Sequence, residues 1–245
     1  MNSSKKSILN SNFTYLAAFV LPVIMMMALY YTRGIFPWGN ECYLRSDMYH
    51  QYAPFFSELW HKIRNGESLT YSWNIGMGTN FTSLFAYYLA SPSNWFVALF
   101  PQKYTIEIMN AFIILKIAGS SLSLTYYLTK HNNNKHVIAA IFGMFYGMSG
   151  FIAAYSWNIM WLDCVILIPL IMLGLERLVN ENRCIFYCIT LGLCIFTNYY
   201  IAIMVCLSVV IYYVVLMIAY NGIKSPMQYV KKFINFCVYS LLKGI

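Results

Sequence analysis

The sequence has few charged residues, and this shortage limits the kind of protein it can encode. Only 10% of its 245 residues are Asp, Glu, Lys or Arg, whereas a soluble domain has about 25%. Hydrophobic residues make up 60% of the chain and form runs long enough for a bilayer core, which needs about 20 helical residues. The composition excludes an ordinary soluble domain and predicts an integral membrane protein in the plasma membrane.

Common cofactor and metal motifs are also missing. The seven cysteines form no metal or redox motif, and Cys42 is the only one in a clearly polar segment, so that segment holds no internal disulfide. No phosphate loop, dinucleotide fingerprint, nucleophile elbow or zinc-protease motif is present. The net charge of +8 comes from basic residues scattered at the ends of apolar runs, which is typical of orientation signals. We therefore expect no nucleic-acid partner.

The apolar runs predict about six membrane-spanning helices in one transmembrane domain covering residues 1–245. The predicted spans are Phe13–Tyr31, Thr105–Thr129, Val137–Tyr155, Asn158–Leu178 and two helices within Cys184–Tyr220. The last run is too long for one helix at about 1.5 Å per residue, and it divides at Thr197-Asn198-Tyr199-Tyr200. The fold class is thus an all-α polytopic membrane protein. Too few residues follow Lys232 to cross again, so we expect the N-terminal piece of a longer protein.

A long loop, residues 32–104, separates the first two spans. Amphipathic spacing after Asp47 predicts a helix lying in the membrane interface. The apolar stretch Phe81–Phe100 follows, interrupted at Ser91-Pro92-Ser93-Asn94. If this stretch does not cross the membrane, nine basic residues lie on the cytoplasmic side and five on the outer side. If it crosses, three lie on the cytoplasmic side and eleven on the outer side. The positive-inside rule therefore predicts a re-entrant or interfacial hairpin, an extracytoplasmic loop and a cytoplasmic N-terminus.

Three polar, aromatic-rich clusters fall on the same predicted side of the membrane. They are Arg45–Tyr52, Ser156–Asp163 and Thr197–Tyr200. Interface belts rich in Trp and Tyr explain the aromatic residues without any site, but they do not explain the carboxylates. The sequence therefore predicts that these clusters form a site at the outer membrane surface.

Three charged residues are the main candidates for chemistry. Asp47 precedes the predicted interfacial helix, where its carboxylate is either a helix cap or a functional group. Asp163 and Lys116 lie inside predicted spans, which indicates a polar interior or a buried ion pair. Asp47 and His50 share a helical face, but two ligands do not make a metal site. No cofactor is assigned, and a divalent metal remains possible.

Several strings resemble one bacterial family. Asp47-Met48-Tyr49-His50-Gln51-Tyr52-Ala53-Pro54-Phe55, Tyr71-Ser72-Trp73-Asn74-Ile75-Gly76-Met77-Gly78-Thr79-Asn80 and Ser91-Pro92-Ser93-Asn94 resemble the YfhO family of membrane proteins. The later segments 157–163 and 169–177 agree with it. The resemblance covers nearly the whole chain in order, and family members are much longer.

The resemblance implies a glycosyltransferase of the GT-C type. Such enzymes transfer a sugar from a polyprenyl-phosphate donor on the outer membrane face to an acceptor, here a cell-envelope polymer such as teichoic acid. By its place after the first span, Asp47 matches the catalytic base. The expected substrate-binding residues are Arg45 and Lys116 for the lipid phosphate, Trp73, Trp157 and Tyr199 for stacking on sugars, Asn74, Asn158 and Asn198 for hydroxyl groups, and His50 and Asp163.

Two other classes of function remain open. A lipid or solute transporter also needs charges within the membrane, and Lys116 with Asp163 could serve one. It would need a pathway open to both sides, whereas the polar clusters gather on one. A non-catalytic membrane assembly protein would bind membrane lipids and partners without needing Asp47.

Overall fold

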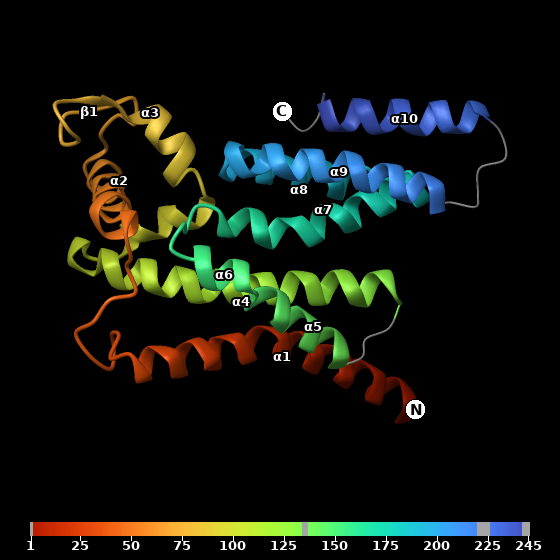
Figure 1. The fold of residues 1–245 in the computed structure, drawn as a ribbon, viewed down its shortest axis with the longest axis horizontal. Helices are drawn as coiled ribbons and strands as arrows, with labels where there is room; N and C mark the ends of the chain where they lie inside the picture. Colours follow the sequence, from red (N-terminus) through yellow and green to blue (C-terminus); the bar gives the residue numbers. More distant parts are fainter. Residues whose placement is uncertain (1, 134–136, 220–225, 242–245) are drawn as a thin grey trace.

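The chain folds into a bundle of helices with a group of short elements at one end. A computed structural model describes residues 2–133, 137–219 and 226–241. The long helices lie side by side along the longest dimension of the molecule (Figure 1). We call the end that carries the short elements of residues 33–104 the loop end, and the opposite end, where α4 and α7 finish, the turn end.

The bundle confirms the predicted all-α membrane fold. Its helices are α1 Asn2–Thr32, α4 Thr105–His131, α5 Val137–Gly147, α6 Gly150–Tyr155, α7 Leu162–Glu181, α8 Ile185–Thr197, α9 Tyr199–Ala219 and α10 Pro226–Leu241. Among the described residues, four segments are long and apolar enough to cross a membrane: Asn12–Thr32, Gln102–His131, Val137–Tyr155 and Tyr199–Ala219. The predicted number of about six also includes α7 and the shorter apolar helix α8, whose crossing stays a prediction.

One predicted span keeps its bounds but is interrupted, and another starts later than predicted. The run Val137–Tyr155 is divided into α5 and α6, with α6 starting at Gly150. The next span starts at Leu162 and not at Asn158, because residues 156–161 form consecutive turns. The division between α8 and α9 falls at Asn198, as predicted. The Asn198 side chain accepts a hydrogen bond of 2.9 Å from the Ile201 N–H, so it caps α9.

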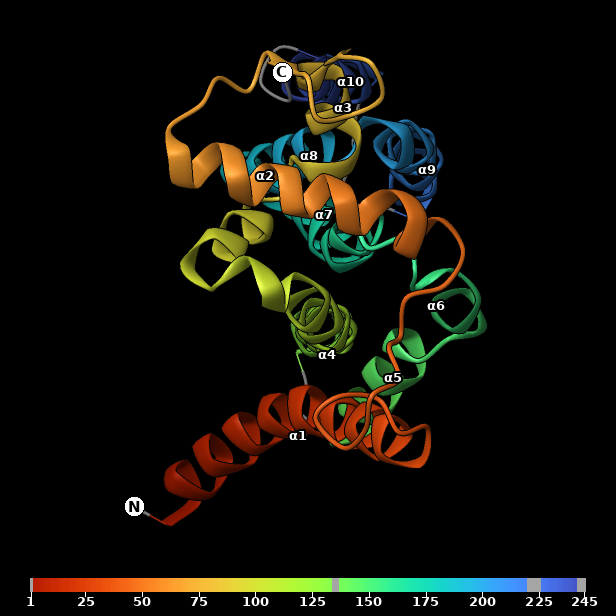
Figure 2. The ribbon, with the colours of Figure 1, turned by 90° about the vertical axis from the view of Figure 1, so that its left-hand side faces the viewer.

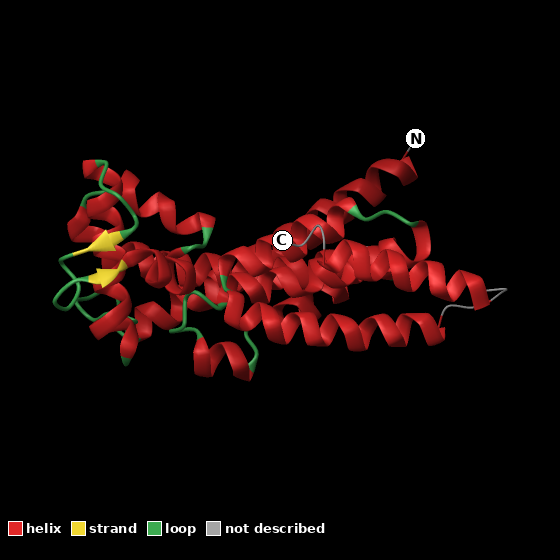
Figure 3. Cartoon of the chain, turned by 90° about the horizontal axis from the view of Figure 1, so that it is seen from above, coloured by secondary structure: helices red, strands yellow, loops and turns green. Residues whose placement is uncertain are grey.

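The short elements form a layer across the loop end. A π-helical turn, η1, runs directly into α2, which crosses the end of the bundle (Figure 2). The elements of this layer are η1 Met48–Tyr52, α2 Ala53–Asn65, β1 Tyr71–Ser72, β2 Thr79–Asn80, α3 Phe81–Leu84, η2 Phe85–Leu89, η3 Pro92–Leu99 and η4 Gln102–Tyr104. The two strands pair antiparallel, with Tyr71 opposite Asn80 (Figure 3). The predicted helix after Asp47 is therefore present.

The apolar stretch Phe81–Phe100 stays at the loop end. It consists of α3, η2 and the 3₁₀ helix η3, which starts at Pro92. Helix α1 ends and helix α4 begins at this same end of the bundle (Figure 1). The segment between them therefore does not run along the bundle. Which end faces the cytoplasm stays a prediction, and two residues of the predicted cytoplasmic set, Lys135 and Lys224, lie outside the described residues.

Helix α4 is the centre of the bundle and packs against α1, α5 and α7. Small residues allow a close approach on the α5 side. A Cβ atom on Gly143 would lie 2.1 Å from Thr125 Oγ1, and one on Gly147 would lie 2.7 Å from the Ile117 carbonyl oxygen. Such contacts between small residues are typical of helices packed in a bilayer. These close contacts hold α5 against α4 up to Gly147, where α5 ends.

Candidate functional site

The first two polar clusters of the sequence meet at the loop end. The Tyr52 hydroxyl donates a hydrogen bond of 3.0 Å to Asn158 Oδ1, and the Tyr52 and Trp157 rings stack 6.3 Å apart with planes 10° apart. The Tyr43 and Ser156 hydroxyls lie 2.7 Å apart. The turns at residues 156–161 are therefore attached to η1 and to the loop that precedes it.

The third cluster joins through the tyrosines of η2. Asn198 Nδ2 donates to the Tyr87 carbonyl oxygen at 3.0 Å, and Tyr199 contacts the Tyr87 ring edge-on at 5.7 Å. The neighbouring Tyr88 ring lies 5.3 Å from that of Tyr52. Asn198 is fully buried and already used by the backbone, so it positions the α8–α9 junction and offers no free amide to a ligand.

Asp47 lies just before η1 and is exposed. Its side chain makes no capping hydrogen bond, so the capping explanation that the sequence left open is not supported. The pKa of Tyr52 is raised, first by burial, then by Tyr88 and by the charge of Asp47. The pKa of Tyr88 is likewise raised, first by burial and in smaller part by Asp47. Asp47 is thus electrostatically linked to the aromatic group around Tyr52 and Tyr88.

A cavity of 570 Å³ lies beside this group, between α1, the loop that follows it and the α5–α6 junction. Arg33 and Arg45 line it, together with Glu41, Tyr43 and Ser156. Neither arginine forms an ion pair within the part of the chain that the structure describes, although the Arg45 guanidinium lies 5.7 Å from the centre of the Tyr43 ring. The rest of the lining is mainly apolar: Met26, Leu29, Ile35, Ile117, Met148, Ile152 and Ala153. The cavity thus combines two arginines and one carboxylate, Glu41, with a hydrocarbon surface.

Lys116 and Asp163 form a buried ion pair. Lys116 Nζ lies 2.6 Å from Asp163 Oδ2, and their side chains are 5% and 15% exposed. Lys116 also donates to the Ile159 carbonyl oxygen at 3.2 Å. Neither residue lines the cavity. The pair ties α4 to α7 and holds the turns that carry Trp157 and Asn158, so it positions the site and is not free to bind a phosphate.

Trp73 and Asn74 lie away from Asp47. They follow β1, and Asn74 Nδ2 donates to Glu58 Oε2 of α2 at 3.0 Å. From residue 47 to residue 58 the helical rise amounts to about 16 Å, at roughly 1.5 Å per residue. The structure therefore divides the predicted site residues into a group around Asp47 and a separate group on the β-hairpin.

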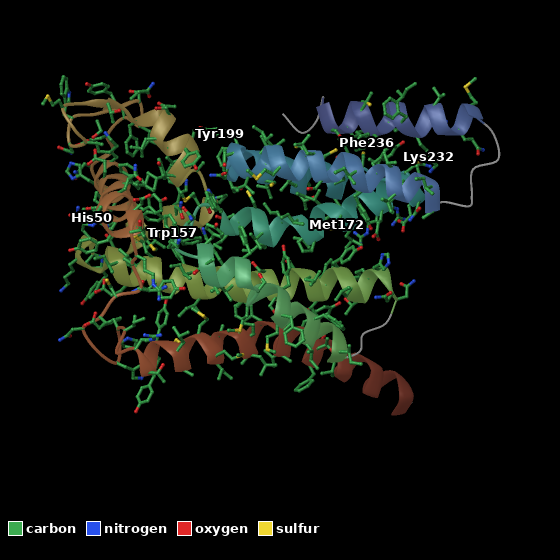
Figure 4. The ribbon with its side chains drawn as sticks, in the orientation of Figure 1. His50, Trp157, Met172, Tyr199, Lys232 and Phe236 are labelled. Carbon is green, nitrogen blue, oxygen red and sulfur yellow. The ribbon has the colours of Figure 1, made fainter. Side chains whose placement is uncertain are left out.

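His50, Trp157 and Tyr199 all lie toward the loop end, whereas Met172, Lys232 and Phe236 lie farther along the bundle (Figure 4). The His50 ring is exposed and packs edge-on against Tyr49 at 5.3 Å. Within the described ranges, no group of three or more His, Cys, Asp or Glu side chains could hold a metal ion.

Two buried donors near Trp157 lack partners. Asn158 Nδ2 and Trp161 Nε1 make no hydrogen bond among the described residues, and buried donors are almost always paired. Both atoms are shielded from solvent, and neither residue lines the cavity.

The sequence reasoning missed Arg33, Tyr43, Tyr88 and Glu58. Arg33 directly follows the first span, and its position at a helix end was read only as an orientation signal. Glu58 lies in the middle of the amphipathic helix, where a carboxylate ordinarily faces water. In the structure its side chain is buried and bonded to the hairpin.

A separate polar cluster lies near the turn end. The Glu176 carboxylate of α7 accepts hydrogen bonds from the hydroxyls of Tyr127 at 2.8 Å and Tyr212 at 2.5 Å. Its Oε1 atom lies 2.9 Å from His131 Nδ1. These partners come from α4 and α9, so the cluster joins three helices.

A comparison with protein families matches residues 17–245 to the family described as bacterial membrane protein YfhO. The comparisons with curated proteins and with solved structures find no match. The family match covers most of the chain, including the loop-end site and both charged pairs of the bundle.

Proposed function

The chain belongs to the YfhO family of bacterial membrane proteins, and from this premise we propose that it is a membrane glycosyltransferase of the GT-C type. It transfers a sugar from a polyprenyl-phosphate-linked donor to a cell-envelope polymer resembling teichoic acid. The loop end faces the outside of the cell, and the N-terminus lies in the cytoplasm of a cell whose plasma membrane holds the bundle.

One observation carries this proposal: the cavity with two unpaired arginines lies next to the loop that bears Asp47. A lipid-linked donor is amphiphilic, with a phosphate joined to a long hydrocarbon chain. Arg33 and Arg45 offer charge-assisted hydrogen bonds to the phosphate. Met26, Leu29 and Ile152 offer the apolar surface that the hydrocarbon chain needs. The lining therefore matches both halves of such a donor.

The reaction follows from these positions. An acceptor hydroxyl attacks the anomeric carbon of the donor sugar while its proton passes to the Asp47 carboxylate. The bond between the anomeric carbon and the phosphate oxygen breaks, and the lipid phosphate departs with the electron pair. Arg33 and Arg45 stabilise the negative charge that develops on that oxygen. Trp157, beside Tyr52 at the loop end, stacks on the sugar.

The test is Asp47→Asn in the full-length protein, with sugar transfer from a purified lipid-linked donor measured in detergent. Loss of a general base lowers the rate by about 10²- to 10⁴-fold. Glu181→Gln is the control, because Glu181 is an exposed carboxylate that pairs with Arg183 and lies away from the loop end. Unchanged transfer by a normally expressed Asp47→Asn protein would remove the base assignment.

The same assay separates the enzyme from the transporter. Detergent micelles offer no second compartment, so transfer in detergent is chemistry and not transport. The transporter hypothesis needs Lys116 and Asp163 as free charges, but in the structure the two side chains form an ion pair with each other.

A further inference from the structure

The β-hairpin carries exposed apolar side chains at the loop end. Trp73 is 77% exposed, Met77 99% and Tyr71 42%. We call these three residues the hairpin platform. An exposed apolar group of this kind, held on an ordered element and away from the spans, is typical of an interaction surface.

The ring pair of the platform is built by the backbone beneath it. Tyr71 and Trp73 meet at 4.9 Å with ring planes 69° apart. A Cβ atom on Gly78 would lie 2.1 Å from the Tyr71 hydroxyl oxygen and 3.0 Å from the Trp73 ring, and Gly78 has a φ of +105°. Only glycine permits this packing and this φ. The rings are therefore fixed from one side and open on the other.

A buried network holds the hairpin on α2. Ser72 Oγ donates to Glu58 Oε1 at 2.6 Å, and Asn74 Nδ2 donates to Glu58 Oε2. Lys62 Nζ donates to the carbonyl oxygens of Ser68 and Tyr71 at 3.1 and 2.9 Å. Glu58 and Lys62 are 7% and 3% exposed. The platform is thus preorganised, which lowers the entropy cost of binding.

The charges around the platform select the kind of ligand. Lys62 lies 3.6 Å from both Glu58 and Glu67, so its charge is neutralised, and the Glu67 carboxylate is itself exposed. An anionic membrane surface or a phosphate group would need unpaired basic residues here. An uncharged sugar ring does not, because its C–H face is apolar and stacks on an aromatic ring.

We propose that the hairpin platform binds uncharged sugar rings carried by the acceptor polymer, on a part of the polymer remote from the reaction. This rests on the proposed function. Along α2 the platform's anchor at Glu58 lies about 16 Å from Asp47, so a single sugar cannot occupy both places. The platform therefore selects polymeric acceptors and holds the chain while its end reaches Asp47.

The binding experiment uses the full chain in detergent and soluble oligomers of glucose and of N-acetylglucosamine, short and long, measured by calorimetry. Trp73→Ala lowers the affinity for the long oligomers about tenfold, the loss of one stacked ring. Gly78→Ala, which displaces the rings without removing them, lowers it too. The matched control is Trp95→Ala, because Trp95 is 44% exposed on η3 of the same layer.

Three results would overturn the proposal. The unmodified protein binds neither oligomer; Trp73→Ala binds the oligomers as tightly as the unmodified protein; or Trp73→Ala loses binding to anionic phospholipid vesicles and not to oligomers.

Failure of the proposed function gives a different pattern of results. If no sugar transfer occurs but Trp73→Ala still loses oligomer binding, the platform proposal is supported and the glycosyltransferase proposal is rejected. If sugar transfer occurs and Trp73→Ala uses long acceptors as efficiently as the unmodified protein, the glycosyltransferase proposal is supported and the platform proposal is rejected.

Discussion

The main polar groups at the two ends of the bundle differ in whether they are bonded to other side chains. Near the turn end, the Glu176 carboxylate is bonded to three side chains from two other helices. At the loop end, Asp47, Arg33 and Arg45 form no ion pair within the described residues, and two buried donors have no partner. Bonded groups stabilise the bundle, whereas open groups are available to a ligand. The contrast supports the proposal that ligands bind at the loop end and that the Glu176 cluster stabilises the bundle.

The largest expected effect is on the buried ion pair. Lys116→Met leaves Asp163 without its partner and lowers the free energy of unfolding by about 3–5 kcal/mol. Denaturation in detergent followed by circular dichroism measures it. The double variant Lys116→Met/Asp163→Leu recovers much of the loss, because no uncompensated charge remains. A single variant as stable as the unmodified protein would show that the pair is not formed.

The turn-end cluster is expected to affect stability alone. Glu176→Ala leaves Tyr127 and Tyr212 without their acceptor and lowers the free energy of unfolding by about 1–3 kcal/mol. Glu181→Ala is the control: its exposed carboxylate pairs only with Arg183, and such pairs contribute little. If Glu176→Ala weakened lipid binding more than it weakened the fold, the division between the two ends would be wrong.

The cavity arginines are expected to show the reverse pattern. Arg33→Gln and Arg45→Gln each weaken binding of a polyprenyl phosphate about tenfold, through loss of one charge-assisted contact, and leave unfolding unchanged. Native mass spectrometry with the added lipid measures the binding. Arg64→Gln serves as control, since Arg64 lies over the Trp60 ring and outside the cavity. Equal losses in all three variants would indicate a general charge effect.

The smallest expected effect is a pH dependence of the hairpin. Burial raises the pKa of Glu58, but hydrogen bonds from Ser72 and Asn74 and the charge of Lys62 outweigh it, so the pKa lies below its ordinary value of 4.5. This contribution, on the order of 1 kcal/mol, is therefore present above that value and is lost as the pH falls through the lowered pKa. Hydrogen exchange of residues 71–80 at neutral and acidic pH measures it. Glu58→Gln removes the difference; a pH response that persists in that variant belongs to another group.

The sequence predicted the features that depend on long-range composition. Apolar runs fixed the helices, and the position of Pro92 predicted the interruption of the stretch 81–100. The charge count predicted that this stretch stays at one end, which the structure places there. These inferences succeed because membrane solvation constrains every residue of a span in the same way.

The sequence could not predict how individual side chains pair. Nothing local distinguishes Glu58, which is buried against the hairpin, from Glu67, which is exposed. Lys116 was assigned to a phosphate or to an ion pair, and only its 2.6 Å distance to Asp163 decides between them. Arg33 and Arg45 lie twelve positions apart, so their shared cavity depends on the path of the loop between them. Pairing of this kind is set by tertiary packing.

Helices α4 and α7 are joined at two places, Lys116 to Asp163 and His131 to Glu176. Between residues 163 and 176 the axial separation is about 20 Å, at roughly 1.5 Å per residue. Two attachment points so far apart make the helix pair resist both sliding and tilting. Any rocking motion between α4 and α7, of the kind that exposes a binding site alternately to the two sides of a membrane, must break both at once. The pair of helices thus forms a rigid frame on which the turns at residues 156–161, and through them η1, are held.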